Sequence, residues 1–173
     1  TNNVRFGANA GNSITSGGTN NVLIGDEAGT AITTADNNVF IGHSAGDALI
    51  DSNQNVAIGV NSLTADTKGS RSTAVGTGTL FSQNFSSATN TFNTAVGFHA
   101  GLSITTGTSN TLIGGEAGDA ITDADFNVAV GYFALSADTT GSKSVAIGTG
   151  TLAVQNFTSA TDAFNVAVGN NAG

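Results

Sequence analysis

The stretch Asn55-Val56-Ala57-Ile58-Gly59 recurs along the whole chain and decides its fold. Its relatives end at nine further glycines, namely Gly7, Gly25, Gly42, Gly76, Gly97, Gly114, Gly131, Gly148 and Gly169. From Gly25 onward these signature glycines are spaced 17, 17, 17 and 21 residues apart, and the series then repeats once. A unit this short, with strand-forming residues in each copy, is typical of a β-solenoid, in which one unit forms one coil and no coil buries its apolar face alone.

Four short units form one longer block of 72 residues. Residues 21–92 align with residues 93–164 without a gap, and 39 of the 72 positions are identical. We therefore expect an all-β parallel solenoid of about ten coils that spans 1–173 as one segment, with partial repeats at 1–20 and 165–173. Because neither end carries a polar cap, we also expect the segment to belong to a longer fibre.

Composition excludes several classes of protein. Of the 173 residues, 39% are hydrophobic and only 9% are charged, and the absence of cysteine excludes disulfides and cysteine-based metal sites. The net charge of -8, with four basic residues, argues against nucleic acid binding through phosphates. No stretch approaches the ~18 consecutive apolar residues of a membrane span, so we expect no membrane insertion in this segment.

Reading the units in register assigns a face to each position. The residues three places and one place before each signature glycine, such as Val56 and Ile58, are mostly aliphatic. Side chains two apart share one face of a strand, so we expect these two columns to be buried inside the coil. The residue between them is usually alanine, as at Ala57 and Ala129, and we expect this column to point outwards and to be covered by another copy of the chain.

The coils are of two kinds after the signature glycine. In one kind a large aliphatic residue stands seven places after it, as at Ile32, whereas in the other a leucine stands four places after it, as at Leu63. We expect each coil to use its one large residue in a short second strand. The fourth coil of each block carries four extra residues, and its phenylalanines, such as Phe85 and Phe92, should fold this bulge back onto the rod.

An asparagine stands four places before the signature glycine in eight of the ten units, and a serine stands there in the other two. Stacked one coil apart, roughly 4.8 Å, these side chains are expected to form a ladder of hydrogen bonds up and down the column.

The repeats at 55–59, 127–131 and 144–148 resemble those of the head domain of trimeric autotransporter adhesins, the YadA-like β-roll, and are similar to repeats in phage tail fibres and other trimeric surface fibres. The resemblance implies a left-handed parallel β-roll and three chains side by side. It also implies a role in adhesion or host recognition, outside the cell, on a bacterial surface or a virion. The partners would be further copies of the chain, sideways and end to end, and a host glycan or protein receptor.

Little in the sequence suggests catalysis or a cofactor. No convergent acid, base and nucleophile is evident, so we expect no enzymatic activity. Asp119, Asp123 and Asp125 cluster near one expected turn, but without a calcium-loop spacing they are better explained as solvated carboxylates.

The two positions after the signature glycine vary most, which predicts that they are exposed, as at Asn61. Two coils carry aromatic surface at these positions, and their residues form the candidate ligand or receptor surface, namely Phe98, His99, Tyr132 and Phe133. These rings could stack on a sugar or pack against a neighbouring chain. An ice-binding solenoid is the alternative function, because threonine is abundant, although it would need one threonine column along many adjacent coils.

Overall fold

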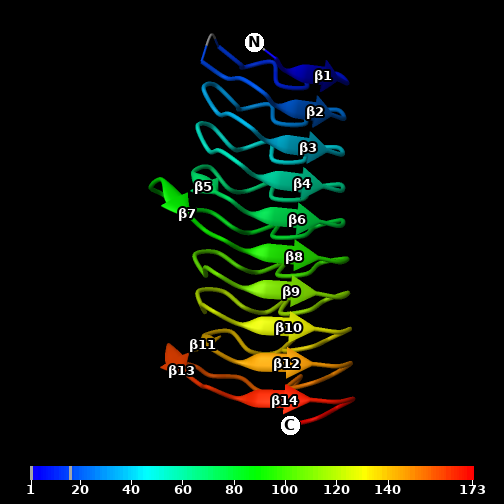
Figure 1. The fold of residues 1–173 in the computed structure, drawn as a ribbon, viewed down its shortest axis with the longest axis vertical. Helices are drawn as coiled ribbons and strands as arrows, with labels where there is room; N and C mark the ends of the chain where they lie inside the picture. The colour runs from blue at the N-terminus through cyan, green and yellow to red at the C-terminus, as the bar shows by residue number, and fades with distance from the viewer. Residues whose placement is uncertain (1, 16) are drawn as a thin grey trace.

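The computed structural model describes residues 2–15 and 17–173, and the part it describes is all β, without a helix. Ten short strands stack in parallel into one sheet, in the order β1-β2-β3-β4-β6-β8-β9-β10-β12-β14. Figure 1 shows these strands as a ladder along a rod, with the chain ends at the two ends of the rod. The predicted parallel β-solenoid of about ten coils is therefore confirmed. The strands of this sheet are β1 (Val4–Phe6), β2 (Val22–Ile24), β3 (Val39–Ile41), β4 (Val56–Ile58), β6 (Thr73–Val75), β8 (Thr94–Val96), β9 (Thr111–Ile113), β10 (Val128–Val130), β12 (Val145–Ile147) and β14 (Val166–Val168).

The two faces of these strands are the reverse of those expected. Ala57 and Ala129, at the centres of β4 and β10, have no exposed surface, whereas Val56 and Ile58 are only half-buried and point outwards. The predicted burial of Val56 and Ile58 inside the coil is therefore wrong, and so is the outward alanine column. The central residue is small where a leucine such as Leu63 comes from the opposite wall, and it can be large where a glycine stands there: Phe40 is also fully buried, and a Cβ on Gly46 would lie 2.7 Å from its ring. Asn61, expected to be exposed, is half-buried.

The two kinds of coil fill the same interior space. Ile32 and Leu63 are both fully buried, which confirms that one large residue comes from one of two places. In the Ile32 coil the fourth residue after the signature glycine is Gly29, where a Cβ would lie 2.9 Å from the Ile32 side chain. Leu63 takes that same position with a φ of 53°, and Asp66 follows where the isoleucine would stand. The expected second strand is wrong, because turns follow each signature glycine.

A buried ladder of asparagines ties successive coils together. Asn110 is fully buried, and its Oδ1 accepts a hydrogen bond from the backbone N–H of Asn127 at 2.9 Å. Its Nδ2 donates to the carbonyl of Ala124 at 2.8 Å. Direct amide-to-amide bonds also occur, as from Asn38 Nδ2 to Asn21 Oδ1 at 3.1 Å. The predicted ladder is confirmed, with the backbone of the next coil as a recurrent partner.

The signature glycines allow successive backbones to approach closely. Their φ angles lie between 126° and 140°, a region that residues with a side chain rarely adopt. A Cβ on Gly131 would lie 2.5 Å from the carbonyl oxygen of Gly148 on the next coil. Both the conformation and the contact therefore require glycine at this position.

The two bulges form small parallel sheets beside the main one. Strand β5 (Gly69–Ser70) pairs with β7 (Thr89–Asn90), and β11 (Gly141–Ser142) pairs with β13 (Thr161–Asp162). Both pairs stand on the same side of the rod in Figure 1. Phe85 folds back into the interior as expected, but Phe92 is 53% exposed, because it occupies a corner position that points outwards on every coil.

A buried polar network supports the first bulge. Asp66 Oδ1 accepts hydrogen bonds from the backbone N–H groups of Gly69 at 2.9 Å and Phe85 at 3.4 Å, and its Oδ2 accepts one from Gln83 at 2.6 Å. Gln83 Oε1 in turn accepts from Asn93 Nδ2 at 2.8 Å. Burial raises the pKa of Asp66 above its usual value, against the opposing effect of these hydrogen bonds.

Candidate interaction surface

The outward side of the ten-stranded sheet, here called the sheet face, is apolar along most of the rod. It consists of the residues three places and one place before each signature glycine, which are valine, isoleucine, threonine and one phenylalanine. The strands pair in register, as Val128 does with Thr111 and Val145, so these side chains form two straight columns. Ile113 and Ile147 remain 40% and 39% exposed. A continuous apolar face of this length is typical of an interaction surface.

Two ridges of side chains border the sheet face. The leading ridge is the residue before each ladder asparagine or serine, at the amino end of each strand, and it runs through Asn20, Asn37, Gln54, Arg71, Phe92, Ser109, Phe126, Lys143 and Phe164. The trailing ridge is the residue after each signature glycine, at the carboxyl end, and it runs through Asp26, His43, Val60, Thr77, Phe98, Gly115, Tyr132, Thr149 and Asn170. All of these residues are exposed except Ser109 and Gly115, which are half-buried.

The structure places two of the four predicted ligand-surface residues on the trailing ridge. Phe98 and Tyr132 are 53% and 52% exposed, while His99 and Phe133 are half-buried beside them. The rings of Phe98 and His99 stack with centroids 3.7 Å apart, and those of Tyr132 and Phe133 are tilted with centroids 4.2 Å apart. The four residues therefore form two pairs rather than one cluster, with the pairs two coils, or about 10 Å, apart.

Gly115 separates the two aromatic pairs on the trailing ridge. A Cβ added to Gly115 would lie 3.3 Å from Cδ2 of Tyr132, so the tyrosine ring leans over the glycine. The ridge is therefore low at the β9 coil and high at the β8 and β10 coils on either side.

The aromatic residues of the leading ridge were not predicted from the sequence as part of a candidate surface. Phe92, Phe126 and Phe164 are 53%, 56% and 66% exposed. All three have left-handed backbone, with φ of 52°, 59° and 52°, as does every residue from Asn20 to Phe164 on this ridge. The signal that could have found them is a phenylalanine directly before a ladder asparagine, where other coils carry a polar residue.

Two basic residues of the leading ridge contact these phenylalanines. The Arg71 guanidinium carbon lies 5.6 Å from the Phe92 ring centroid, and Lys143 Nζ lies 5.3 Å from that of Phe164. Both distances are within the range of a cation–π interaction. The basic side chains therefore lie along the ridge and cover one side of each ring.

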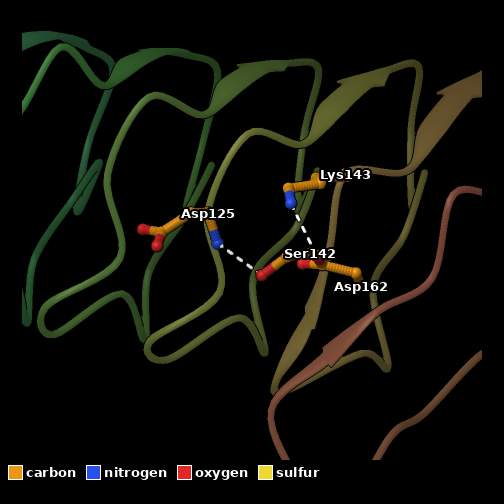
Figure 2. A network of polar contacts seen from close by, with 4 residues as sticks. All are labelled: Asp125, Ser142, Lys143 and Asp162. Atoms are coloured by element: carbon orange, nitrogen blue, oxygen red, sulfur yellow. Dashed lines mark hydrogen bonds and ion pairs between the residues drawn. The ribbon is translucent and has the colours of Figure 1, made fainter.

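Figure 2 shows how the second bulge is tied to the leading ridge. Lys143 Nζ pairs with Asp162 Oδ2 of β13 at 2.6 Å. The neighbouring backbone N–H of Asp125 donates to Ser142 Oγ of β11 at 2.9 Å. Because both charged side chains of the ion pair are well exposed, water screens their attraction and the pair contributes little stability.

The three aspartates near the predicted turn do not form a shared site. Asp123 Oδ1 accepts a hydrogen bond from Thr122, and Asp125 Oδ1 accepts two from Thr108. Asp119 Oδ1 is buried without a partner among the described residues, and burial, followed by the nearby Glu116 charge, raises the pKa of Asp119. Within residues 2–15 and 17–173, no three histidine or acidic side chains gather where they could hold a metal ion.

No helix that could cross a membrane occurs in the described ranges. The chain matches no described protein family, no curated protein and no solved structure, so its candidate surface is defined by its own geometry.

Proposed function

We propose that this chain is a rigid structural segment of an adhesive fibre, in which three copies lie side by side with their sheet faces turned to a common axis. The observation that carries the proposal is the sheet face, which leaves two columns of mostly aliphatic side chains half-exposed on a single chain. Three copies around a threefold axis would cover this face on one another. The interface is thus formed by the valine and isoleucine columns, in place of the alanine column expected from the sequence.

The same proposal includes the finer features that the repeat resemblance implies. The solenoid is left-handed, the 72-residue block is the unit by which the fibre is lengthened, and the fibre stands outside the cell on a bacterial surface or a virion. Its surface contributes to contact with a host glycan or protein receptor, and the fibre has no catalytic role. This proposal is supported by the repeated stretch Asn55-Val56-Ala57-Ile58-Gly59 and by the stacking of its strands into one parallel sheet that runs along the rod.

Three glutamate substitutions test the trimer. Val130 lies on the sheet face, Ala129 beside it is fully buried, and Val154 is 84% exposed outside the main sheet. Light scattering should give three times the chain mass of 17.0 kDa for the wild type and for Val154→Glu. Val130→Glu should give a folded β monomer, because a trimer would bury three unpaired carboxylates. Ala129→Glu should lose the β circular dichroism signal altogether.

A wild-type chain that remains a monodisperse monomer at high concentration would overturn the trimer. A Val130→Glu variant that is still trimeric would show instead that the sheet face is not the interface.

Ice binding remains the second candidate, favoured by one observation on the sheet face. Thr73, Thr94 and Thr111 pair in register on three successive coils, and all three are half-buried. Valine occupies this column on the other seven coils. Thermal hysteresis of the purified chain, abolished by Thr94→Glu, would support this function over the fibre.

A further inference from the structure

The aromatic residues of the two ridges coincide on two levels of the rod. On the β8 coil both are aromatic, with Phe92 leading and Phe98 trailing, and on the β10 coil they are again aromatic, with Phe126 and Tyr132. On the β9 coil between them both are small. On the β2, β3, β6 and β12 coils both ridges carry polar or charged residues, whereas on the β4 coil the leading residue is Gln54 and the trailing residue is the aliphatic Val60. The β14 coil alone, with Phe164 and Asn170, carries an aromatic on one side only.

A single chain gives no reason for this match. Phe92 and Phe98 stand at opposite ends of one strand, and six residues of extended chain span about 20 Å. Aromatic rings interact when their centroids are about 4.5–7 Å apart, so these two rings cannot contact each other within one molecule. The two ridges are also separated by the whole sheet face, which keeps them apart at every level.

A threefold arrangement brings the two ridges together. When three copies turn the same face to one axis, the interface is heterologous, and the leading ridge of one copy borders the trailing ridge of the next. Rotation about an axis parallel to the rod involves no shift along it. Residues on the same coil level of neighbouring copies therefore meet, large opposite large and small opposite small.

We propose that Phe92 and Phe126 of one chain pack against Phe98 and Tyr132 of a second copy of this chain, and that these two aromatic levels fix the axial register of the fibre. The inference rests on the trimer proposed above and adds which residues meet in it. The Arg71 side chain over Phe92 and the stacking of His99 on Phe98 hold the two rings of the β8 level in place before assembly. The predicted ligand surface at Phe98 and Tyr132 is then largely a contact between subunits.

Photo-crosslinking tests which level meets which. Phe92→p-benzoylphenylalanine keeps an aromatic ring at the site, and mixing isotopically light and heavy chains distinguishes links between copies from links within one. The expected product joins position 92 of one copy to the segment around Phe98 of another. The matched control places the same amino acid at Phe81, which is 39% exposed and outside both ridges, and should give no link to the trailing ridge of another copy.

A double-mutant cycle measures the contact itself. Phe92→Ala and Phe98→Ala should be coupled, because either change alone removes the same aromatic pair. Three such pairs per trimer should give a coupling of about 10- to 1000-fold in the trimer dissociation constant. Phe92→Ala with Tyr132→Ala, two levels apart, should show no coupling and serves as the control.

The outcomes separate this inference from the trimer. If the protein is a trimer but crosslinks from position 92 reach the Tyr132 level or beyond, the proposed register is wrong. The same holds if Phe92→Ala and Phe98→Ala show no coupling. In both cases the trimer itself stands. A chain that stays monomeric overturns both. If alanine substitution of Phe92, Phe98, Phe126 and Tyr132 leaves the trimer unaffected but abolishes glycan binding, these rings form a ligand surface and the proposed contact is refuted.

Discussion

Replacing a signature glycine by alanine should destabilise the rod through the neighbouring coil as well as through its own backbone. In Gly131→Ala, the new Cβ would lie 2.5 Å from the Gly148 carbonyl oxygen, 0.9 Å short of the 3.4 Å at which ordinary contact begins. The next coil could move away to relieve this clash, but the movement would stretch the flanking hydrogen bonds. These run from the N–H of Gly148 to the carbonyl of Val130 at 2.7 Å and from the N–H of Gly150 to the carbonyl of Tyr132 at 2.8 Å. Two such bonds are worth about 1–3 kcal/mol together. The strained φ adds about 1–3 kcal/mol.

Two further alanine variants separate these contributions. Gly169→Ala has nearly the same φ, 132° against 136° at Gly131, but its Cβ would meet only Ala172 at 3.8 Å in the 173-residue chain. It should lose the strain contribution alone, about 1–3 kcal/mol. Gly115, on the trailing ridge midway along the rod, has no left-handed backbone, and a Cβ there would approach only the Tyr132 ring. Gly115→Ala should therefore change the free energy of unfolding by no more than about 0.5 kcal/mol.

The measurement is urea unfolding followed by circular dichroism, at one protein concentration for all variants because assembly shifts the apparent stability. We expect the free energy of unfolding to fall most for Gly131→Ala, less for Gly169→Ala and least for Gly115→Ala. A Gly131→Ala variant no less stable than Gly169→Ala would refute the coil-to-coil contact. A large effect of Gly115→Ala would show that any added methyl group disturbs the rod.

Three further predictions concern polar side chains. Asn110→Ala should lower the free energy of unfolding in urea by about 2–5 kcal/mol, because it leaves the Asn127 N–H and the Ala124 carbonyl buried without partners. A decrease below about 0.5 kcal/mol would contradict the ladder. Asp66 has a raised pKa in the folded chain, so its contribution to stability should be greatest below the usual value of 3.8 and should fall as pH rises through the raised pKa. The free energy of unfolding of the wild type minus that of Asp66→Asn should therefore fall as pH rises. A rise of this difference with pH would contradict the prediction. Asp162→Asn should change stability by less than about 1 kcal/mol, since its pair with Lys143 is exposed, and a larger loss would mean that the bulge contact matters more than its exposure suggests.

The sequence predicted the coil but assigned its two faces wrongly. A 17-residue spacing of glycines with strand residues before each one is enough to establish a stack of parallel strands. Alternation could not say which side faces inwards, because Val56, Ala57 and Ile58 are all apolar. The central column is buried whether its residue is Ala57 or Phe40, so the inward face does not follow from side-chain size and only the folded chain shows it.

The candidate surface was predicted in part. Variation after the signature glycine correctly pointed to exposed rings at Phe98 and Tyr132. The leading ridge was missed because Phe92 was interpreted as part of a bulge that folds back, whereas its left-handed backbone turns the ring outwards. That the aromatic residues of the two ridges coincide on the β8 and β10 coils becomes visible only when residues six apart in sequence are known to stand at opposite edges of one face.

Hydrogen bonds that run from each coil to the next have a mechanical consequence for a fibre. A pull along the rod acts on these bonds one coil after another, because each coil is joined only to its neighbours, as Val128 is to Ser144 and Gly131 to Ile113. A released coil of 17 residues extends to about 56–61 Å, where it had occupied about 4.8 Å of rod. Each coil that opens therefore becomes more than tenfold longer than its folded rise and dissipates energy, so the fibre proposed above would yield in many small steps under load.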